Sequence, residues 1–129
     1  MKQFIKVMKA LSDPNRVKIM KMLQCRPLCV CEINEVLEIA QSTASKHLKI
    51  LEDAELISGF KDGLWVNYSI ADGRGSPYAA NMIGNLTHWL EDSSEIKQIK
   101  QALPEVDRFD IVGKQQKSKL EVKKEDIIS

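Results

Sequence analysis

The chain has 129 residues, of which 43% are apolar, so it is the size of one small domain and has enough apolar material for one core. Its 19 basic and 18 acidic residues give a formal net charge of +1, which excludes a uniformly basic coat for nucleic acid but not a single basic face. No apolar run approaches the ~20 residues that span a bilayer, and residues 1–16 lack the apolar stretch of a signal peptide. We therefore expect a cytoplasmic protein that makes no membrane contact.

The first part of the chain predicts three helices. Residues 2–11 place four apolar side chains at helical spacing with lysines opposite them: Phe4, Ile5, Met8 and Leu11. Asp13 is a good N-cap and Pro14 suits the first helical position, which predicts a second helix over 14–23. Pro27 marks the next boundary, and a third helix is predicted over about 28–39.

A fourth helix is predicted over 42–54, after the short connection Ala40-Gln41 and with Ser42 or Gln41 as its cap. Its apolar stripe consists of Ala44, Leu48 and Leu51. Two helices joined by so short a turn, the second rich in small polar and basic residues, are typical of a helix-turn-helix.

The period of the pattern then changes from helix to strand. Strands are predicted over 56–60 and 64–70, joined by a turn at Lys61-Asp62-Gly63. A long amphipathic helix over 76–92 and a shorter one over 95–103 follow. The predicted fold class is therefore mainly α with a β-hairpin wing, a winged helix-turn-helix. It is expected to be dimeric, because the apolar stripe over 76–92 suits an interface formed with the first helix.

This pattern predicts that the chain divides into two regions. Residues 1–103 are predicted to form the DNA-binding and dimerisation domain. Residues 104–129 are polar and are predicted to form a mobile C-terminal tail.

The predicted fourth helix carries no acid between Gln41 and Ile50, as a DNA-reading helix requires. Thr43, Ser45 and Lys46 are the candidates for base edges, since short donors and acceptors near a helix start can reach them. The other candidate contacts, to phosphate or on the helix flank, are Gln41, Ser42, His47, Lys49 and, on the wing, Lys61. A solvated helix face is the alternative for this surface, and packing is the alternative for His47.

Three cysteines lie within seven residues: Cys25, Cys29 and Cys31. Thiolates select soft or borderline centres such as As(III), Sb(III), Cd(II), Pb(II) and Zn(II). A redox switch that joins Cys25 to Cys29 or Cys31, and three inert buried thiols, are the alternatives. A helix N-terminus is expected to lower the pKa of such thiols. Residues two apart in a regular helix point about 200° away from each other, so Cys29 and Cys31 are expected to need an unwound helix start to hold one small centre.

Four segments together resemble the ArsR/SmtB family of metal-responsive repressors: ALSDPNRVKIMKML, LCVCEI, AQSTASKHLKILEDAELI and GFKDGLWVNYSI. The resemblance covers about residues 3–92. It implies a homodimeric winged-helix repressor that binds double-stranded operator DNA and whose complex is weakened by metal or oxidant.

Within that resemblance, LCVCEI is similar to the Leu-Cys-Val-Cys-Asp-Leu motif of arsenic- and cadmium-responsive members, which implies Cys29 and Cys31 as ligands. Arsenic sensors commonly add a third cysteine where this chain has Asn34, and Cys25 is the substitute in this sequence. His88 and Glu91 resemble half of a zinc site of other members, but Gly75 and Pro77 stand where its partner ligands would be.

No catalytic constellation is visible, so the chain is not expected to be an enzyme. The predicted function is a DNA-binding transcriptional repressor whose operator affinity falls when clustered cysteines bind arsenite or another soft metal(loid). As(III) or Sb(III) is the foremost inducer, and Cd(II), Pb(II) and Zn(II) are alternatives. A thiol redox-sensing repressor and a metal-binding or thiol-buffering protein are the alternative functions.

Overall fold

The computed structural model describes residues 1–106 and Ile111. Over these residues the elements in chain order are α1 (Lys2–Ala10), α2 (Pro14–Cys25), β1 (Leu28–Cys29), α3 (Val30–Leu37), α4 (Gln41–Asp53), β2 (Ile57–Asp62), β3 (Trp65–Ile70), α5 (Pro77–Leu86), α6 (Ser94–Ala102) and the short 3-10 helix η1 (Leu103–Glu105). Most of the predicted tail 104–129 lies outside the described residues.

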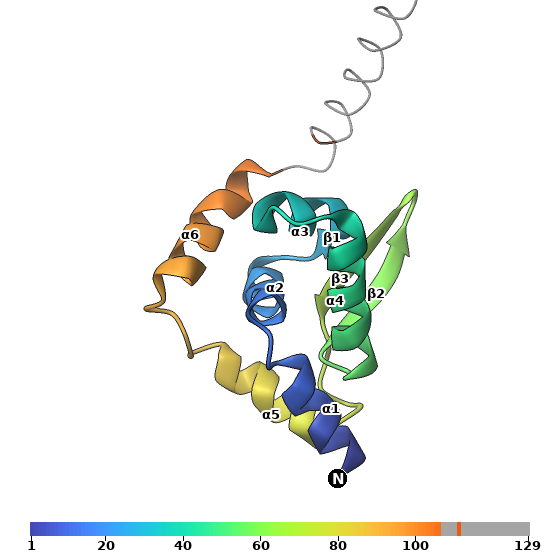
Figure 1. Cartoon of the computed structure of the whole chain (residues 1–129). Coiled ribbons are helices and arrows are strands. Elements are labelled where there is room, and N and C mark those ends of the chain that lie inside the picture. Colours follow the sequence, from blue (N-terminus) through green and yellow to red (C-terminus); the bar gives the residue numbers. More distant parts are fainter. Residues whose placement is uncertain (107–110, 112–129) are drawn as a thin grey trace, which may run out of the picture.

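Helix α2 lies at the centre of the fold, with the other helices and the sheet arranged around it (Figure 1). It begins where the sequence predicts, because Asp13 Oδ1 accepts hydrogen bonds from the backbone N–H groups of Asn15 at 2.9 Å and Arg16 at 3.1 Å. Its buried side chains include Ile19 and Met20, neither of which has any exposed surface. The core therefore gathers around this one helix.

Helices α3 and α4 form the predicted helix-turn-helix. Glu38 ends α3 in the left-handed conformation at φ 55°, and two further residues lead into α4. The predicted stripe of Ala44, Leu48 and Leu51 is buried. The predicted cap was wrong: Gln41 and Ser42 lie inside the helix, and the N-cap is Ala40, whose side chain cannot accept a hydrogen bond.

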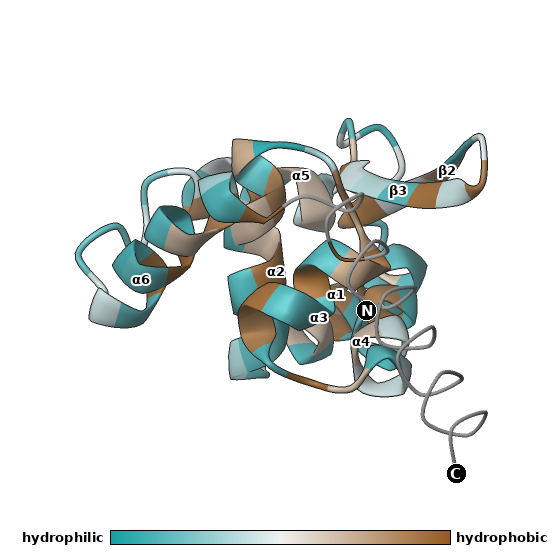
Figure 2. Ribbon diagram, turned by 90° about the horizontal axis from the view of Figure 1, so that it is seen from above, coloured by the Kyte–Doolittle hydropathy of each residue, from teal (hydrophilic) through white to brown (hydrophobic). Residues whose placement is uncertain are grey.

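The sheet has three antiparallel strands, with β3 in the middle between β1 and β2. The predicted hairpin is present, with Asp62 opposite Trp65 and Gly63 in the turn at φ +62°, a conformation that favours glycine. Figure 2 shows the hairpin projecting from the helical body with hydrophobic stretches along it. Strand β1 corrects the predicted third helix, because its residues Leu28 and Cys29 pair with Tyr68 and Asn67 instead of starting that helix.

The predicted long helix over 76–92 was wrong in its second half. Helix α5 ends at Leu86, and residues 87–92 form turns in which Leu90 has a φ of 66°. At this point the fully buried Lys21 approaches from α2, and its ammonium group donates to the Leu86 carbonyl at 2.7 Å and the Trp89 carbonyl at 2.9 Å. These carbonyls are therefore held by a side chain of α2 at the point where α5 stops. The following helix, α6, lies as predicted.

Helices α1 and α5 lie side by side (Figure 1) and carry exposed apolar side chains. Phe4 of α1 and Tyr78 of α5 stack edge to face with ring centroids 5.5 Å apart, and each is about 40% exposed. Ile5 is also exposed, whereas the buried residues of α1 are Val7 and Ala10. Of the four apolar residues predicted from the spacing, Phe4 and Ile5 are exposed and Met8 and Leu11 are half-buried against the core.

Candidate DNA-binding and thiol sites

The exposed face of α4 carries most of the predicted DNA-binding residues. The side chains on this face are Gln41, Ser42, Thr43, Ser45, Lys46 and Lys49. Lys49 forms a surface ion pair with Asp53 at 3.2 Å, and Lys61 is exposed near the end of the hairpin. Apart from Asp53 at its end and the neighbouring Glu52, the helix carries no acid. Among residues 1–106 and Ile111, the arrangement presents short polar groups and a lysine without an ion pair, Lys46, in the N-terminal half of an exposed helix.

The start of α4 is also free of a side-chain cap. No side chain accepts a hydrogen bond from its first turn, and the first turn holds no acidic residue. The backbone N–H groups of that turn therefore keep the partial positive charge of a helix N-terminus. Such a terminus is suited to a phosphate group.

His47 differs from its neighbours because it is half-buried and held by Arg16. Arg16 Nη1 donates to His47 Nδ1 at 3.2 Å, and the same guanidinium donates to the carbonyls of Ala10 at 2.7 Å and Lys9 at 3.1 Å. The structure gives His47 a packing contact through Arg16, and its contact with phosphate stays a prediction. This contact ties α4 to α2 and to the end of α1.

Cys29 lies at the junction of β1 and α3. It is the N-cap of α3 with extended backbone (φ −87°, ψ 165°), and only 1% of it is exposed. Its own N–H donates to Glu32 Oε1 at 3.0 Å, the side-chain half of a capping box. Cys29 precedes the helix as its N-cap and Cys31 is the second helical residue, so the two cysteines are not two positions of one regular helix, and the Cys31 side chain is near enough to raise the pKa of the Cys29 thiol. The premise that both cysteines lie in a regular helix was wrong, because the backbone of Cys29 is extended, and the joint binding of one small centre by Cys29 and Cys31 stays a prediction.

Burial controls the ionisation of Cys29. Desolvation by burial, with the Cys31 side chain as the next cause, raises the pKa of the Cys29 thiol to about 12, although the Glu32 backbone N–H acts in the opposite direction. The expected lowering by the helix N-terminus is therefore outweighed. Cys29 is a neutral thiol at pH 7, and any ion that binds it as a thiolate must displace its proton.

Cys25 stands apart from the other two cysteines. It is the last residue of α2, is exposed, and its thiol donates to the Lys21 carbonyl at a sulfur–oxygen distance of 3.7 Å. Over residues 1–106 and Ile111, no three His, Cys, Asp or Glu side chains are grouped so that they could hold a metal ion. The structure thus places Cys29 and Cys31 at the start of α3 and Cys25 at the end of α2.

Asn34 occupies the place where a third sulfur was considered. With its amide nitrogen facing the helix backbone, it donates to the Val30 carbonyl at 2.8 Å and the Cys31 carbonyl at 3.3 Å. An amide oxygen is a hard donor and does not replace a thiolate for a soft ion.

Arg26 is a residue that sequence reasoning missed. Its guanidinium donates to Glu32 Oε2 at 3.0 Å, to the Val106 carbonyl at 2.9 Å and to the Leu103 carbonyl at 3.3 Å. Arg26 therefore joins the capping box of the thiol pair to the end of η1. A basic residue between two cysteines was the only local signal.

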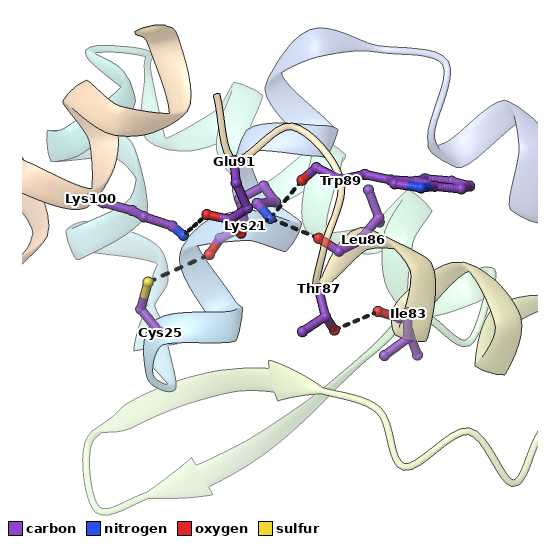
Figure 3. A network of polar contacts seen from close by, with 8 residues as sticks. All are labelled: Lys21, Cys25, Ile83, Leu86, Thr87, Trp89, Glu91 and Lys100. Carbon is purple, nitrogen blue, oxygen red and sulfur yellow. Dashed lines mark hydrogen bonds and ion pairs between the residues drawn. The ribbon is translucent and has the colours of Figure 1, made fainter. Parts of the chain in front are cut away.

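The half zinc site suggested by His88 and Glu91 is not assembled. His88 is exposed in the turns after α5. Glu91 accepts hydrogen bonds from Lys21 at 2.6 Å and from Lys100, and Figure 3 shows its carboxylate between the two lysines. These partners lower the pKa of Glu91 to about 2, first through Lys100 and then through Lys21. Sequence reasoning missed this ion network because its members lie far apart in the chain.

The part of the chain that the structure describes has no helix with the length and apolar character to cross a bilayer. The helix-turn-helix and its hairpin define a winged helix-turn-helix protein. A solved structure of HlyU from Vibrio cholerae N16961 is similar to it, with a TM-score of 0.56 and 29% sequence identity over 66% of this chain and 88% of that one.

Sequence comparison places the chain among known regulators. The profile described as "Bacterial regulatory protein, arsR family" matches residues 13–58. An arsenical resistance operon repressor of Staphylococcus aureus is 39% identical over 75 residues, which are 55% of this chain and 72% of that protein. Another from Bacillus subtilis (strain 168) is 45% identical over 65 residues, 50% of this chain.

The chain belongs to the ArsR family of bacterial regulatory proteins. The matched part spans 62% of the length of the B. subtilis repressor, so less than two thirds of that relative is covered. The relatives are named as repressors and regulators rather than as enzymes, in agreement with the expectation from the sequence.

Proposed function

We propose that this protein is a transcriptional repressor that binds operator DNA as a homodimer and loses affinity for it when its cysteines bind arsenite or another soft metal(loid). The observation that carries the proposal is the position of Cys29 and Cys31, which flank the first residue of α3, the helix that precedes α4 in the helix-turn-helix. The names of the S. aureus and B. subtilis relatives support an arsenical as the inducer.

The DNA side of the proposal rests on α4. Thr43, Ser45 and Lys46 are exposed on its N-terminal half, where short polar side chains reach base edges in the major groove. Ser42, Lys49, the uncapped N-terminus and Lys61 of the hairpin are positioned for phosphates. The small net charge makes the complex dependent on these few groups.

The dimer rests on the exposed apolar face of α1 and α5. Phe4, Ile5 and Tyr78 are each about 40% exposed on these neighbouring helices. A second copy of this chain is the partner that buries such a face while placing two α4 helices on successive turns of DNA.

Ligand binding can act on DNA affinity through the position of Cys29. This residue ends β1, which pairs with the wing strand β3, and it also caps α3, the first helix of the helix-turn-helix. A centre that draws Cys29 and Cys31 to sulfur–metal distances changes both connections at once. Because α4 packs on α3, the DNA-competent arrangement of the dimer is disfavoured.

Fluorescence anisotropy tests the proposal with a DNA duplex selected from a random pool by repeated binding to the full chain. Arsenite, antimonite, Cd(II), Pb(II), Zn(II) and peroxide are each titrated into the complex. We expect arsenite to release the DNA, and Cys29→Ser or Cys31→Ser to bind DNA with unchanged affinity and resist release. Ser94→Ala, which changes an exposed hydroxyl on α6, is the matched control and keeps the normal response.

Other outcomes identify the alternatives. Release by peroxide alone, with loss in the same cysteine variants, assigns a redox sensor. Binding of metal without any selected DNA assigns a metal-binding or thiol-buffering protein. If both cysteine variants release DNA normally with arsenite, the thiol pair is not the sensing site.

A further inference from the structure

We propose that Arg26 is a positioning residue that holds Cys25 away from the Cys29–Cys31 pair, and that a three-sulfur ligand must break its contacts with the end of η1. The inference rests on the proposed function, because it concerns how the same thiols complete a site for As(III). According to this inference, the segment Leu103–Val106 moves when the three sulfurs close around As(III).

The contacts of Arg26 span three parts of the fold. Its Nη1 donates to Glu32, whose other carboxylate oxygen holds the backbone N–H of Cys29. Its Nη2 donates to the carbonyls of Val106 and Leu103. One guanidinium therefore fixes both the start of α3 and the end of η1, and Glu32, with 5% exposure, is buried at their centre.

The chain on the two sides of Arg26 differs in freedom. Leu28 and Cys29 are buried and paired with β3, so they cannot approach Cys25 without loss of the sheet contact. Cys25 and Pro27 are exposed, and α2 ends at Cys25. A third sulfur can therefore reach the pair only through displacement of the segment 25–27, in which Arg26 is the anchored residue.

The chemistry of arsenite requires that displacement. Arsenous acid exchanges each of its three hydroxyl groups for one cysteine sulfur: an As–S bond forms, an As–O bond breaks, and the thiol proton leaves with the hydroxyl group as water. Cys29 and Cys31 flank the first residue of α3, and the third cysteine of this chain is Cys25. Phenylarsine oxide forms only two As–S bonds, and its oxygen leaves as one water, so the existing pair satisfies it.

Hydrogen–deuterium exchange of the full chain, without DNA, tests this difference. The Val106 N–H donates to the Leu103 carbonyl at 3.2 Å, so peptides that cover Leu103–Val106 report release of this end. We expect arsenite to accelerate exchange there at least threefold in the wild type and phenylarsine oxide to leave it unchanged. Cys25→Ser is expected to abolish the arsenite effect and keep phenylarsine oxide binding.

The Arg26 variants separate positioning from folding. Arg26→Ala removes contacts that arsenite must otherwise break, so its affinity for arsenite is expected to rise about tenfold, as the loss of one charged hydrogen bond predicts, with less than twofold change for phenylarsine oxide. Arg26→Lys keeps the Glu32 ion pair but cannot span to both carbonyls. Its arsenite affinity is expected to lie between that of the wild type and that of Arg26→Ala.

Several results overturn the inference. They are unchanged exchange at Leu103–Val106 in arsenite-bound wild type, equal effects of the two arsenicals, and arsenite affinity that is unaltered in Cys25→Ser. If Arg26→Ala does not fold, the comparison of arsenite with phenylarsine oxide on the wild type still tests the inference. Failure of the proposed function is a separate result, since it is measured as DNA affinity that no ligand alters.

Discussion

Lys21 is the buried cation on which the end of α5 depends, and its replacement gives a measurable loss of stability. Its ammonium group contacts two backbone carbonyls and Glu91 and is fully enclosed (Figure 3). Lys21→Ala leaves the buried Leu86 carbonyl without a donor, at about 1–3 kcal/mol, and removes three methylenes of the stem, at about 0.8 kcal/mol each. We expect the free energy of unfolding to fall by about 3–5 kcal/mol.

Lys21→Met separates the two contributions, because methionine keeps a stem of similar length and loses the ammonium group. The loss is expected to be about 1–3 kcal/mol, since removal of the desolvated charge offsets part of the lost hydrogen bonds. Urea unfolding followed by circular dichroism measures both variants, at two protein concentrations so that dimer dissociation is accounted for. A Lys21→Met variant as stable as the wild type would refute the reasoning that these contacts fix the end of α5.

Three further predictions concern other parts of the chain. Lys46→Ala is expected to weaken DNA binding at least fivefold in anisotropy titrations, whereas Lys97→Ala on α6 leaves it unchanged; equal effects would move the DNA-reading face away from α4. Asp13→Ala removes a cap that accepts two hydrogen bonds and should cost about 1 kcal/mol in urea unfolding, whereas Ser93→Ala, at a cap without a side-chain bond, should cost almost nothing. Because the pKa of Glu91 is lowered from 4.5 to about 2, its stabilising contribution is present above pH 4.5 and is lost as the pH falls toward 2; Glu91→Gln should remove that part of the acid sensitivity, and an unchanged pH profile would contradict the role of the ion pairs.

The elements that the sequence predicted are those whose signals are local. Asp13 and Pro14 set the start of α2, and an Asp-Gly turn set the hairpin. Strand β1 was not predictable in the same way, because two residues have no periodicity and their partners on β3 lie about forty residues away. The apolar pattern also continued past Leu86, whose carbonyl accepts a hydrogen bond from a lysine 65 residues upstream.

The candidate sites show the same difference between local signals, which the sequence reveals, and contacts between distant residues, which it does not. The exposed face of α4 followed from the helical spacing of its buried stripe, and the thiol cluster was visible as a spacing. The ionisation of Cys29 was predicted in the wrong direction, because burial by the whole fold outweighs the helix N-terminus. The role of Arg26 was not visible, since its carbonyl partners lie 77 and 80 residues further along the chain.

Helix α2 contacts the elements proposed to bind DNA, to form the dimer and to bind arsenite. Along α2 and its C-cap, Arg16 contacts His47 of α4, Lys21 contacts the end of α5, and Arg26 contacts Glu32 of the capping box at Cys29. A helix of 12 residues moves as a rigid body more readily than it bends, because its core side chains are closely packed. A pull on Cys25 at one end is therefore applied along α2 to both the DNA-binding and the dimer-forming elements. Arg16→Ala should accordingly weaken the effect of arsenite on DNA binding while leaving arsenite affinity unchanged, and a normal response in that variant would show that α3 and the wing carry the coupling alone.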